Sequence, residues 1–242
     1  MNRRLVQLIA FLFFTAGIGA AATEAALIHN YDLNDSLADS LGGPSLISNG
    51  GVLGPTGLTF GPNEGPSLAG GLPDPATYSI VMGVSLDDVS SFRKLLDFKG
   101  LTSDTGLYNE IGVLNFYQVA FGAGTSISAG VQVEIMLTRD GATDEVTGAV
   151  NGIQQFSFID GSGDAIFSEP GALINFLQDD FFTGQRESTG GFLDYIRIYD
   201  IVVPEPGSMM LAVLAAGPLV VGTSWRKRRR STDPVNIRRT RC

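Results

Sequence analysis

The chain has little of several residue types that would indicate particular functions. Its 242 residues include one cysteine, Cys242, one histidine, His29, and one tryptophan, Trp225. A single cysteine excludes an intrachain disulfide and any site that needs several thiolates for a metal or for redox chemistry. The lone histidine has no evident nucleophilic partner, which argues against a Ser-His-Asp arrangement, and we expect an ordinary strand residue there.

Basic residues are scarce between the two ends of the chain. Residues 27–203 contain 22 acidic and six basic residues, a net charge of about −16. So acidic a surface repels nucleic acid and anionic lipid, and we expect neither as a partner of this region. It suits solubility outside the cell, and it offers carboxylates to Ca²⁺.

The first 25 residues have the parts of a secretory signal peptide. Arg3 and Arg4 precede an apolar run at residues 5–14, and small residues follow. This pattern predicts export through the inner membrane and removal of residues 1–25. An N-terminal membrane anchor is the alternative, although the apolar run is short for a span.

A second targeting pattern follows the acidic region. The tripeptide Pro204-Glu205-Pro206 precedes an apolar stretch at residues 208–224, and the basic cluster Arg226-Lys227-Arg228-Arg229-Arg230 comes next. As a helix, the apolar stretch would span about 25 Å, enough for one short transmembrane helix. The basic cluster should hold its end in the cytoplasm and leave the acidic region outside. Residues 231–242 are then a cytoplasmic tail.

These three parts, in this order, resemble the PEP-CTERM sorting signal of Gram-negative bacteria over residues 203–230. The resemblance implies an exosortase, a membrane enzyme that cuts near the tripeptide, as a processing partner. It also implies transient anchoring, followed by transfer to the cell surface or an exopolysaccharide matrix. Residues 231–242 extend beyond the point where such signals usually stop. An ordinary single-pass anchor is the alternative.

The region between the two targeting segments has the pattern of antiparallel strands. Apolar and polar residues alternate at residues 78–86, 131–138 and 196–198, and turn sequences such as Asn151-Gly152 separate them. No alternation of strands with helices supports a parallel α/β fold. We therefore expect an all-β domain at residues 26–202, a two-sheet jelly-roll sandwich.

The order of motifs resembles laminin-G-like, concanavalin A-like domains over about residues 27–201. An acidic segment at residues 29–36 comes first, and the last strand contains Gly191-x-x-Asp194-x-x-Arg197-x-Tyr199. Several relatives of this fold bind one Ca²⁺ at the rim, and by resemblance we assign Asp39 and Asp194 as calcium ligands.

Asp194 has the same strand parity as Ile196 and Ile198, so we expect an inward side chain. A metal ion, or backbone N–H donors, would offset the cost of burying that carboxylate. A structural aspartate bonded to a turn is an equally good interpretation.

Two further groups are candidates for ligand contacts. Asp179 and Asp180 follow an apolar segment and are predicted to bind a ligand, either a sugar hydroxyl or a cation; solvated turn residues are the alternative. Tyr117, Tyr195 and the pair Phe181-Phe182 are able to stack on a sugar ring, or to serve as packing residues.

Catalysis has little support in the sequence. Glycosidases of this fold place alternating carboxylates along one strand, whereas residues 131–138 offer Glu134 alone. We therefore expect a non-catalytic surface or matrix protein that binds glycan or exopolysaccharide. The alternatives are a polysaccharide-active hydrolase and a matrix component that associates with itself.

Overall fold

The computed structural model describes residues 25–167 and 173–203. The chain divides into two units, Met1–Val203 and Pro204–Cys242, and the described residues all belong to the first. The signal peptide up to residue 24, the sorting tripeptide, the apolar stretch, the basic cluster and the tail lie outside them. No helix within the described residues is long and apolar enough to cross a membrane.

Thirteen strands make up the described fold. They are β1 (Leu27–Tyr31), β2 (Val52–Gly54), β3 (Gly57–Phe60), β4 (Ser67–Leu68), β5 (Tyr78–Leu86), β6 (Phe92–Asp97), β7 (Gly106–Glu110), β8 (Val113–Phe116), β9 (Val133–Asp140), β10 (Glu145–Val150), β11 (Ile153–Ile159), β12 (Ile174–Phe176) and β13 (Gly191–Tyr199).

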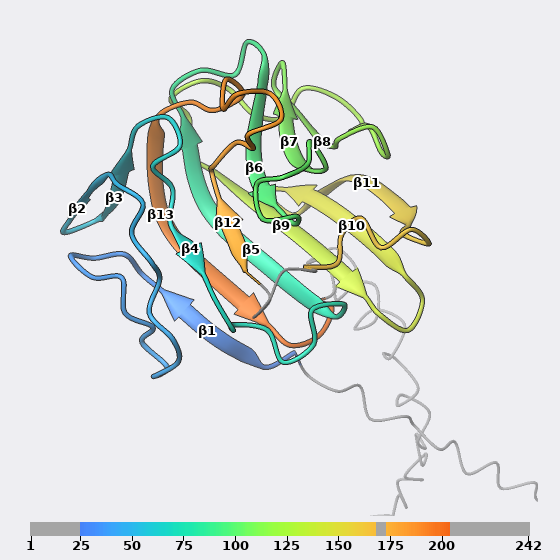
Figure 1. The fold of residues 1–242 in the computed structure, drawn as a ribbon, viewed down its shortest axis with the longest axis horizontal. Coiled ribbons are helices and arrows are strands. Elements are labelled where there is room, and N and C mark those ends of the chain that lie inside the picture. The colour runs from blue at the N-terminus through green and yellow to red at the C-terminus, as the bar shows by residue number, and fades with distance from the viewer. Residues whose placement is uncertain (1–24, 168–172, 204–242) are drawn as a thin grey trace, which may run out of the picture. The chain divides into compact units, whose positions relative to one another are not determined.

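The strands form two antiparallel sheets (Figure 1). The larger sheet has eight strands in the order β11-β10-β9-β5-β13-β3-β2, with β1 also paired to β13. The smaller sheet has five, in the order β4-β12-β6-β7-β8. The described residues contain no α-helix. The predicted all-β, two-sheet sandwich is confirmed.

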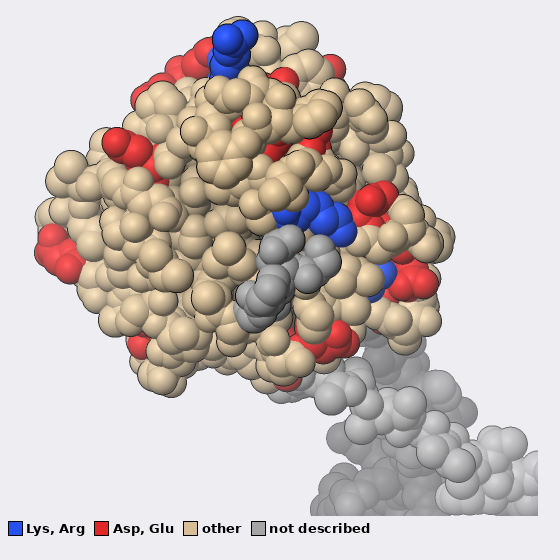
Figure 2. Space-filling view, viewed as in Figure 1, with Lys and Arg blue, Asp and Glu red and all other residues tan. Residues whose placement is uncertain are grey.

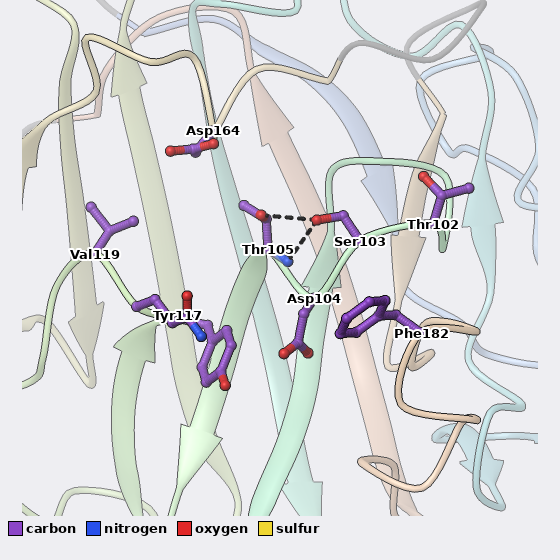
Figure 3. Close-up of a pocket in the computed structure, with 9 residues that line it drawn as sticks. Thr102, Ser103, Asp104, Thr105, Tyr117, Val119, Asp164 and Phe182 are labelled. Atoms are coloured by element: carbon purple, nitrogen blue, oxygen red, sulfur yellow. Dashed lines mark hydrogen bonds between the residues drawn. The ribbon is translucent and has the colours of Figure 1, made fainter.

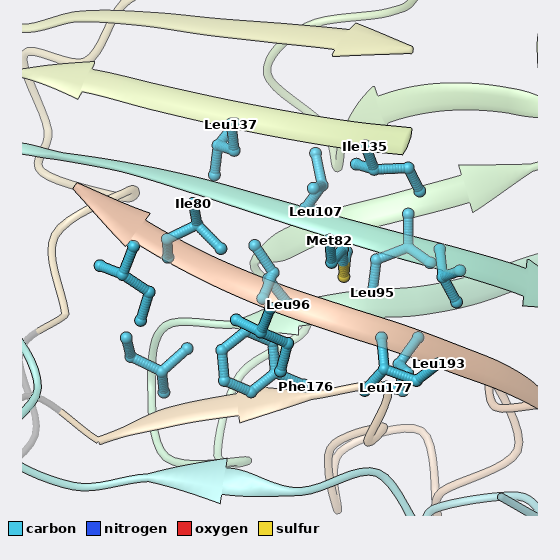
Figure 4. Packing of buried hydrophobic residues seen from close by; sticks show 14 of the residues in the cluster. Ile80, Met82, Leu95, Leu96, Leu107, Ile135, Leu137, Phe176, Leu177 and Leu193 are labelled. Carbon is cyan, nitrogen blue, oxygen red and sulfur yellow. The ribbon is translucent and has the colours of Figure 1, made fainter. Parts of the chain in front are cut away.

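Apolar side chains from the facing surfaces of the two sheets form one core (Figure 4). Leu95, Leu96, Leu107 and Phe176 of the smaller sheet are at most 1% exposed. Burial of each such side chain stabilises the fold by about 1.5–3 kcal/mol. On β5, the alternate residues predicted to share a face are also at most 1% exposed: Tyr78, Ile80, Met82, Val84 and Leu86.

The outer face of the larger sheet is less polar than the alternation predicts. Val81, Met136 and Ala149 are at most 7% exposed and form a second apolar cluster. Tyr195 and Tyr199 pack against this cluster and cover it. Side chains lying flat on a sheet can therefore bury apolar groups without a second layer.

Two irregularities overturn local predictions. Val131 precedes β9 in a turn, where its N–H donates to the Ser128 carbonyl at 3.1 Å, and its side chain is 52% exposed. In β13, the pairing with β5 passes from Leu193 directly to Tyr195, so Asp194 is the extra residue of a β-bulge. Leu193 takes the buried position and Asp194 is only partly buried, so the predicted inward orientation of Asp194 is wrong.

Candidate functional site

A pocket of about 550 Å³ lies where β6 ends, β7 begins and β8 ends (Figure 3). Four separate segments form its wall, so no single stretch of sequence contains it. The lining residues are Thr102, Ser103, Asp104 and Thr105 from the β6–β7 loop, Tyr117, Gln118 and Val119 after β8, Asp164 from the β11–β12 connection, and Phe182 from the β12–β13 loop.

Two aromatic rings border the pocket, and the Asp104 carboxylate lies between them in Figure 3. The Tyr117 ring packs edge-on against Phe92 and obliquely against Tyr108, with ring centroids 5.5 and 5.3 Å apart. These contacts fix its orientation. Phe182 is 77% exposed and leaves its ring open to a ligand.

The polar groups of the pocket combine acceptors with hydroxyls. Asp104 Oδ1 accepts a hydrogen bond from the Tyr108 hydroxyl at 3.0 Å. Burial, and then the neighbouring carboxylates, raise the pKa of Tyr108, so its hydroxyl stays protonated and donates. Among the described residues no donor reaches Asp104 Oδ2. The Ser103 and Thr105 hydroxyls lie 3.1 Å apart at the same wall.

Beneath the pocket, a buried ion-pair network holds the loops in place. The Lys94 Nζ lies 2.7 Å from Asp180 Oδ2 and 3.2 Å from Asp97 Oδ2, and it donates to the Ser103 carbonyl at 2.8 Å. Burial alone would raise the pKa of Asp180, but the hydrogen bond and charge of Lys94, together with backbone N–H donors, hold that pKa below its usual value. The pocket wall is thereby joined to the core of the smaller sheet.

Asp179 and Asp180 lie in this lower layer and not at the surface. Both are 0% exposed, so the alternative of solvated turn residues is wrong. Their oxygens accept hydrogen bonds from the loop that follows, from Phe182, Thr183 and Glu187. Direct contact with a ligand stays a prediction, and in the geometry described here their effect on the pocket is to position the loop.

Glu187 lies at the end of that loop, where its N–H donates to Asp179. Burial, with the charges of Asp104, Asp179 and Asp180, raises the pKa of its carboxyl from 4.5 to about 7. The charge of Lys94 opposes this rise. A carboxyl of this kind is protonated in part near neutral pH.

Asp39 has four internal hydrogen-bond partners. Its Oδ1 accepts from the N–H groups of Asn30 and Leu41, and its Oδ2 from Gly43 N–H and His29 Nδ1, at 2.7–3.0 Å. Burial raises the pKa of the Asp39 carboxyl, but these donors outweigh it and lower the pKa overall. His29 lies in β1, as predicted, with Nε2 2.8 Å from the Gly71 carbonyl.

Calcium binding by Asp39 and Asp194 stays a prediction. Within the described residues, no three His, Cys, Asp or Glu side chains are grouped so that they could hold a metal ion. The hydrogen bonds of Asp39 fit the alternative of a structural aspartate bonded to a turn. An unchanged melting temperature on adding chelator would rule calcium out, since a ligand of the native state raises it.

The other aromatic candidates separate in space. Tyr195 lies on the outer face of the larger sheet, where its hydroxyl donates to Glu134 at 2.6 Å and its ring stacks on Arg197 at 4.2 Å. Phe181 is 66% exposed but does not line the pocket. Only Tyr117 and Phe182 meet there. No local pattern in the sequence pointed to Asp104, because the two rings on either side of it come from other loops.

Comparison with known proteins supports the fold and the sorting signal. The sequence matches the PEP-CTERM protein-sorting motif at residues 202–230. No curated protein shows a significant match.

Several solved structures share the fold. Domain 4 of AbnA, a GH43 extracellular arabinanase from Geobacillus stearothermophilus in complex with arabinotriose, is 18% identical with a TM-score of 0.55, over 78% of this chain and 100% of that one. Trypanosoma rangeli sialidase is 14% identical with a TM-score of 0.54, over 74% of this chain and 31% of that one. The binding domain of botulinum neurotoxin DC, in complex with rat synaptotagmin II, is 10% identical with a TM-score of 0.55, over 76% and 50%.

At these identities the likeness concerns the fold alone, and this chain spans about a third of the sialidase and half of the neurotoxin domain. The sorting motif is the more specific finding, because it concerns what happens to the protein and not only its shape. The chain carries a PEP-CTERM sorting motif after a β-sandwich, and it is accordingly an exported protein that an exosortase sorts.

Proposed function

We propose that the sandwich is a non-catalytic module that binds a glycan in the pocket between Tyr117, Asp104 and Phe182. The observation that carries this proposal is the arrangement of a fixed ring, an exposed ring and a carboxylate between them. Aromatic faces suit the C–H surface of a sugar, and a carboxylate accepts from its hydroxyls. A pocket of about 550 Å³ is within the range of small-ligand sites.

The exported location fits such a ligand. Polysaccharides of the cell surface and the surrounding matrix are accessible to a protein that an exosortase sorts, and we propose these as the source of the glycan. The domain of AbnA that shares this fold was solved with arabinotriose, which makes oligosaccharides reasonable first probes. Acidic side chains are spread over the face in Figure 2 and basic ones are few, which favours a neutral glycan over a polyanionic one.

The test compares two adjacent phenylalanines on a glycan array that includes arabinan oligosaccharides. Phe182→Ala removes a ring that lines the pocket, whereas Phe181→Ala removes an exposed ring that does not. Loss of one stacking contact, about 1 kcal/mol, should weaken binding by about five- to tenfold in the first variant only. Equal retention of both variants, or loss in both, would place the ligand elsewhere.

A hydrolase is the second candidate, because Asp104 and Asp164 both line the pocket and paired carboxylates hydrolyse glycosidic bonds. Asp164 accepts a hydrogen bond from Ser162 at 2.6 Å, and Glu134 bonds to Tyr195 on the outer sheet face. Glu134 therefore lies away from the pocket, and Asp104 and Asp164 are the two carboxylates that a hydrolase would use there. Release of reducing sugar from a bound polymer, abolished in Asp104→Asn, would favour the enzyme.

A further inference from the structure

The loop of residues 179–187 connects the exposed ring of the pocket to the buried carboxylates. Asp180 Oδ1 accepts from the N–H groups of Phe182 and Thr183 at 2.8 and 3.1 Å. Asp179 Oδ2 accepts from the Thr183 hydroxyl at 2.8 Å and from Glu187 N–H at 2.7 Å. The position of Phe182 therefore depends on the charge state of the layer beneath it.

That layer carries more negative charge than its ion pairs balance. Among the described residues, the only ion pairs made by its five carboxylates are those of Asp97 and Asp180 with Lys94. Asp97, Asp179 and Asp180 are buried, whereas Glu187 and Asp104, which also lines the pocket, are partly buried.

Three carboxylate oxygens of this group are buried without a hydrogen-bond donor among the described residues: Asp97 Oδ2, Asp179 Oδ1 and Glu187 Oε2. The Lys94 ammonium lies 3.2 Å from Asp97 Oδ2 and balances its charge, so the other two oxygens have neither a donor nor a cation. A buried carboxylate oxygen without a donor is costly, and a native structure needs a group that compensates it. Among the described residues, no three acidic, histidine or cysteine side chains are grouped there so that they could hold a metal ion. A proton on Glu187 removes one charge and turns one of the orphan acceptors into a donor.

We propose that Glu187 holds a proton when the loop is closed, that is, when the hydrogen bonds to Asp179 and Asp180 are formed. Loss of this proton opens the loop and weakens the binding of glycan in the pocket. Only the last step, the effect on glycan, rests on the function proposed above. The groups that face Glu187 are Lys94 of β6, Asp104 of the β6–β7 loop, Tyr108 of β7, and Asp179 and Asp180 of its own loop.

The direction of the pH dependence follows from the raised pKa. The carboxyl titrates at about 7 in the closed loop and near its ordinary value of 4.5 when the loop is open. The proton therefore favours the closed loop fully below pH 4.5, and this contribution is lost as the pH rises to about 7. Above that pH both states are deprotonated, and the opening equilibrium no longer changes.

Hydrogen–deuterium exchange of the full chain in detergent micelles tests the loop without any ligand. The probes are the amides of Phe182, Thr183 and Glu187, with rates corrected for the intrinsic effect of pH. Between pH 5 and pH 7 the opening constant should rise by about tenfold or more, and it should level off above pH 7. An opening constant that is flat in the wild-type chain over this range would overturn the proposal.

The matched variants are Glu187→Gln, which is neutral at every pH, and Glu145→Gln, which alters an exposed glutamate on β10. Glu145→Gln should keep the full rise and Glu187→Gln should lose it. The proposal would be overturned if the opening constant rose equally in both variants. It would also be overturned if millimolar CaCl₂ abolished the rise in the wild-type chain, because a cation would then balance the carboxylates in place of the proton.

A measurement of glycan binding distinguishes failure of the proposed function from failure of the loop mechanism. If the array finds no glycan while exchange shows the expected rise, the function fails and the loop mechanism stands. If a glycan binds at the pocket with equal affinity at pH 5 and pH 7, the coupling of loop to ligand fails and the function stands.

Discussion

The contacts of Lys94 cannot be inferred from its neighbours in the sequence. It lies in β6 between Arg93 and Leu95, and neither indicates a partner for its ammonium group. Its side chain is 0% exposed, between two carboxylates. One of these, Asp180, is 86 residues away in sequence and arrives through the pairing of β12 with β6. Only the topology reveals this contact.

We expect Lys94→Met to destabilise the fold by about 3–5 kcal/mol, because it leaves Asp180 and Asp97 buried without their cation. The matched control is Lys99→Met. Lys99 is only partly buried and donates to the Gly163 carbonyl at 2.9 Å, a hydrogen bond worth about 1 kcal/mol. Urea unfolding of both variants measures the difference, and similar losses of stability would show that the buried pair contributes little.

At the scale of elements, strands were predictable where the pairing is regular. The alternation on β5 holds along its whole length, because its pairing with β9 is regular and the bulge in its pairing with β13 adds a residue to β13 and none to β5. The parity of Asp194 failed because one extra residue in β13 shifts the side chains that precede it. Such a bulge depends on how the strand pairs with its partner, and the local sequence does not indicate that pairing.

The pocket was the least predictable element of the structure. Tyr117 and Phe182 were candidates by residue type, and the structure brings them together with Asp104. Their neighbours on the chain gave no reason to pair them, since they belong to different loops. The sandwich architecture could be predicted from local patterns, whereas the site needed long-range pairing.

The turn between β10 and β11 was recognisable from Asn151-Gly152, and both residues have positive φ, 50° and 72°. We expect Gly152→Val to destabilise the fold by about 1–2 kcal/mol, the cost of a side chain in the left-handed region. Gly161→Val is the control, because a Cβ there meets no atom within 4 Å. Urea unfolding should separate the two, and equal effects would contradict this account of the turn.

At the scale of the whole molecule, the acidic sandwich and the sorting motif belong to different stages of one process. The motif at residues 202–230 begins where the described fold ends. We expect mass spectrometry of the exported protein to show a chain that starts near Ala26 and lacks residues 226–242. Replacing Pro204, Glu205 and Pro206 by alanine should leave the tail attached. Retention of the tail on every exported wild-type molecule would exclude processing.

The last strand of the sandwich, β13, lies in the interior of the larger sheet. It pairs with β5 along one side and with β3 and β1 along the other, and the Asp200 N–H donates to the Ala26 carbonyl at 3.3 Å. Because β13 pairs with both β5 and β3, these two strands are not connected within the sheet until β13 has been exported. The sheet is thus completed only after nearly all of the domain has crossed the membrane, and a cut beside the tripeptide afterwards removes none of the thirteen described strands.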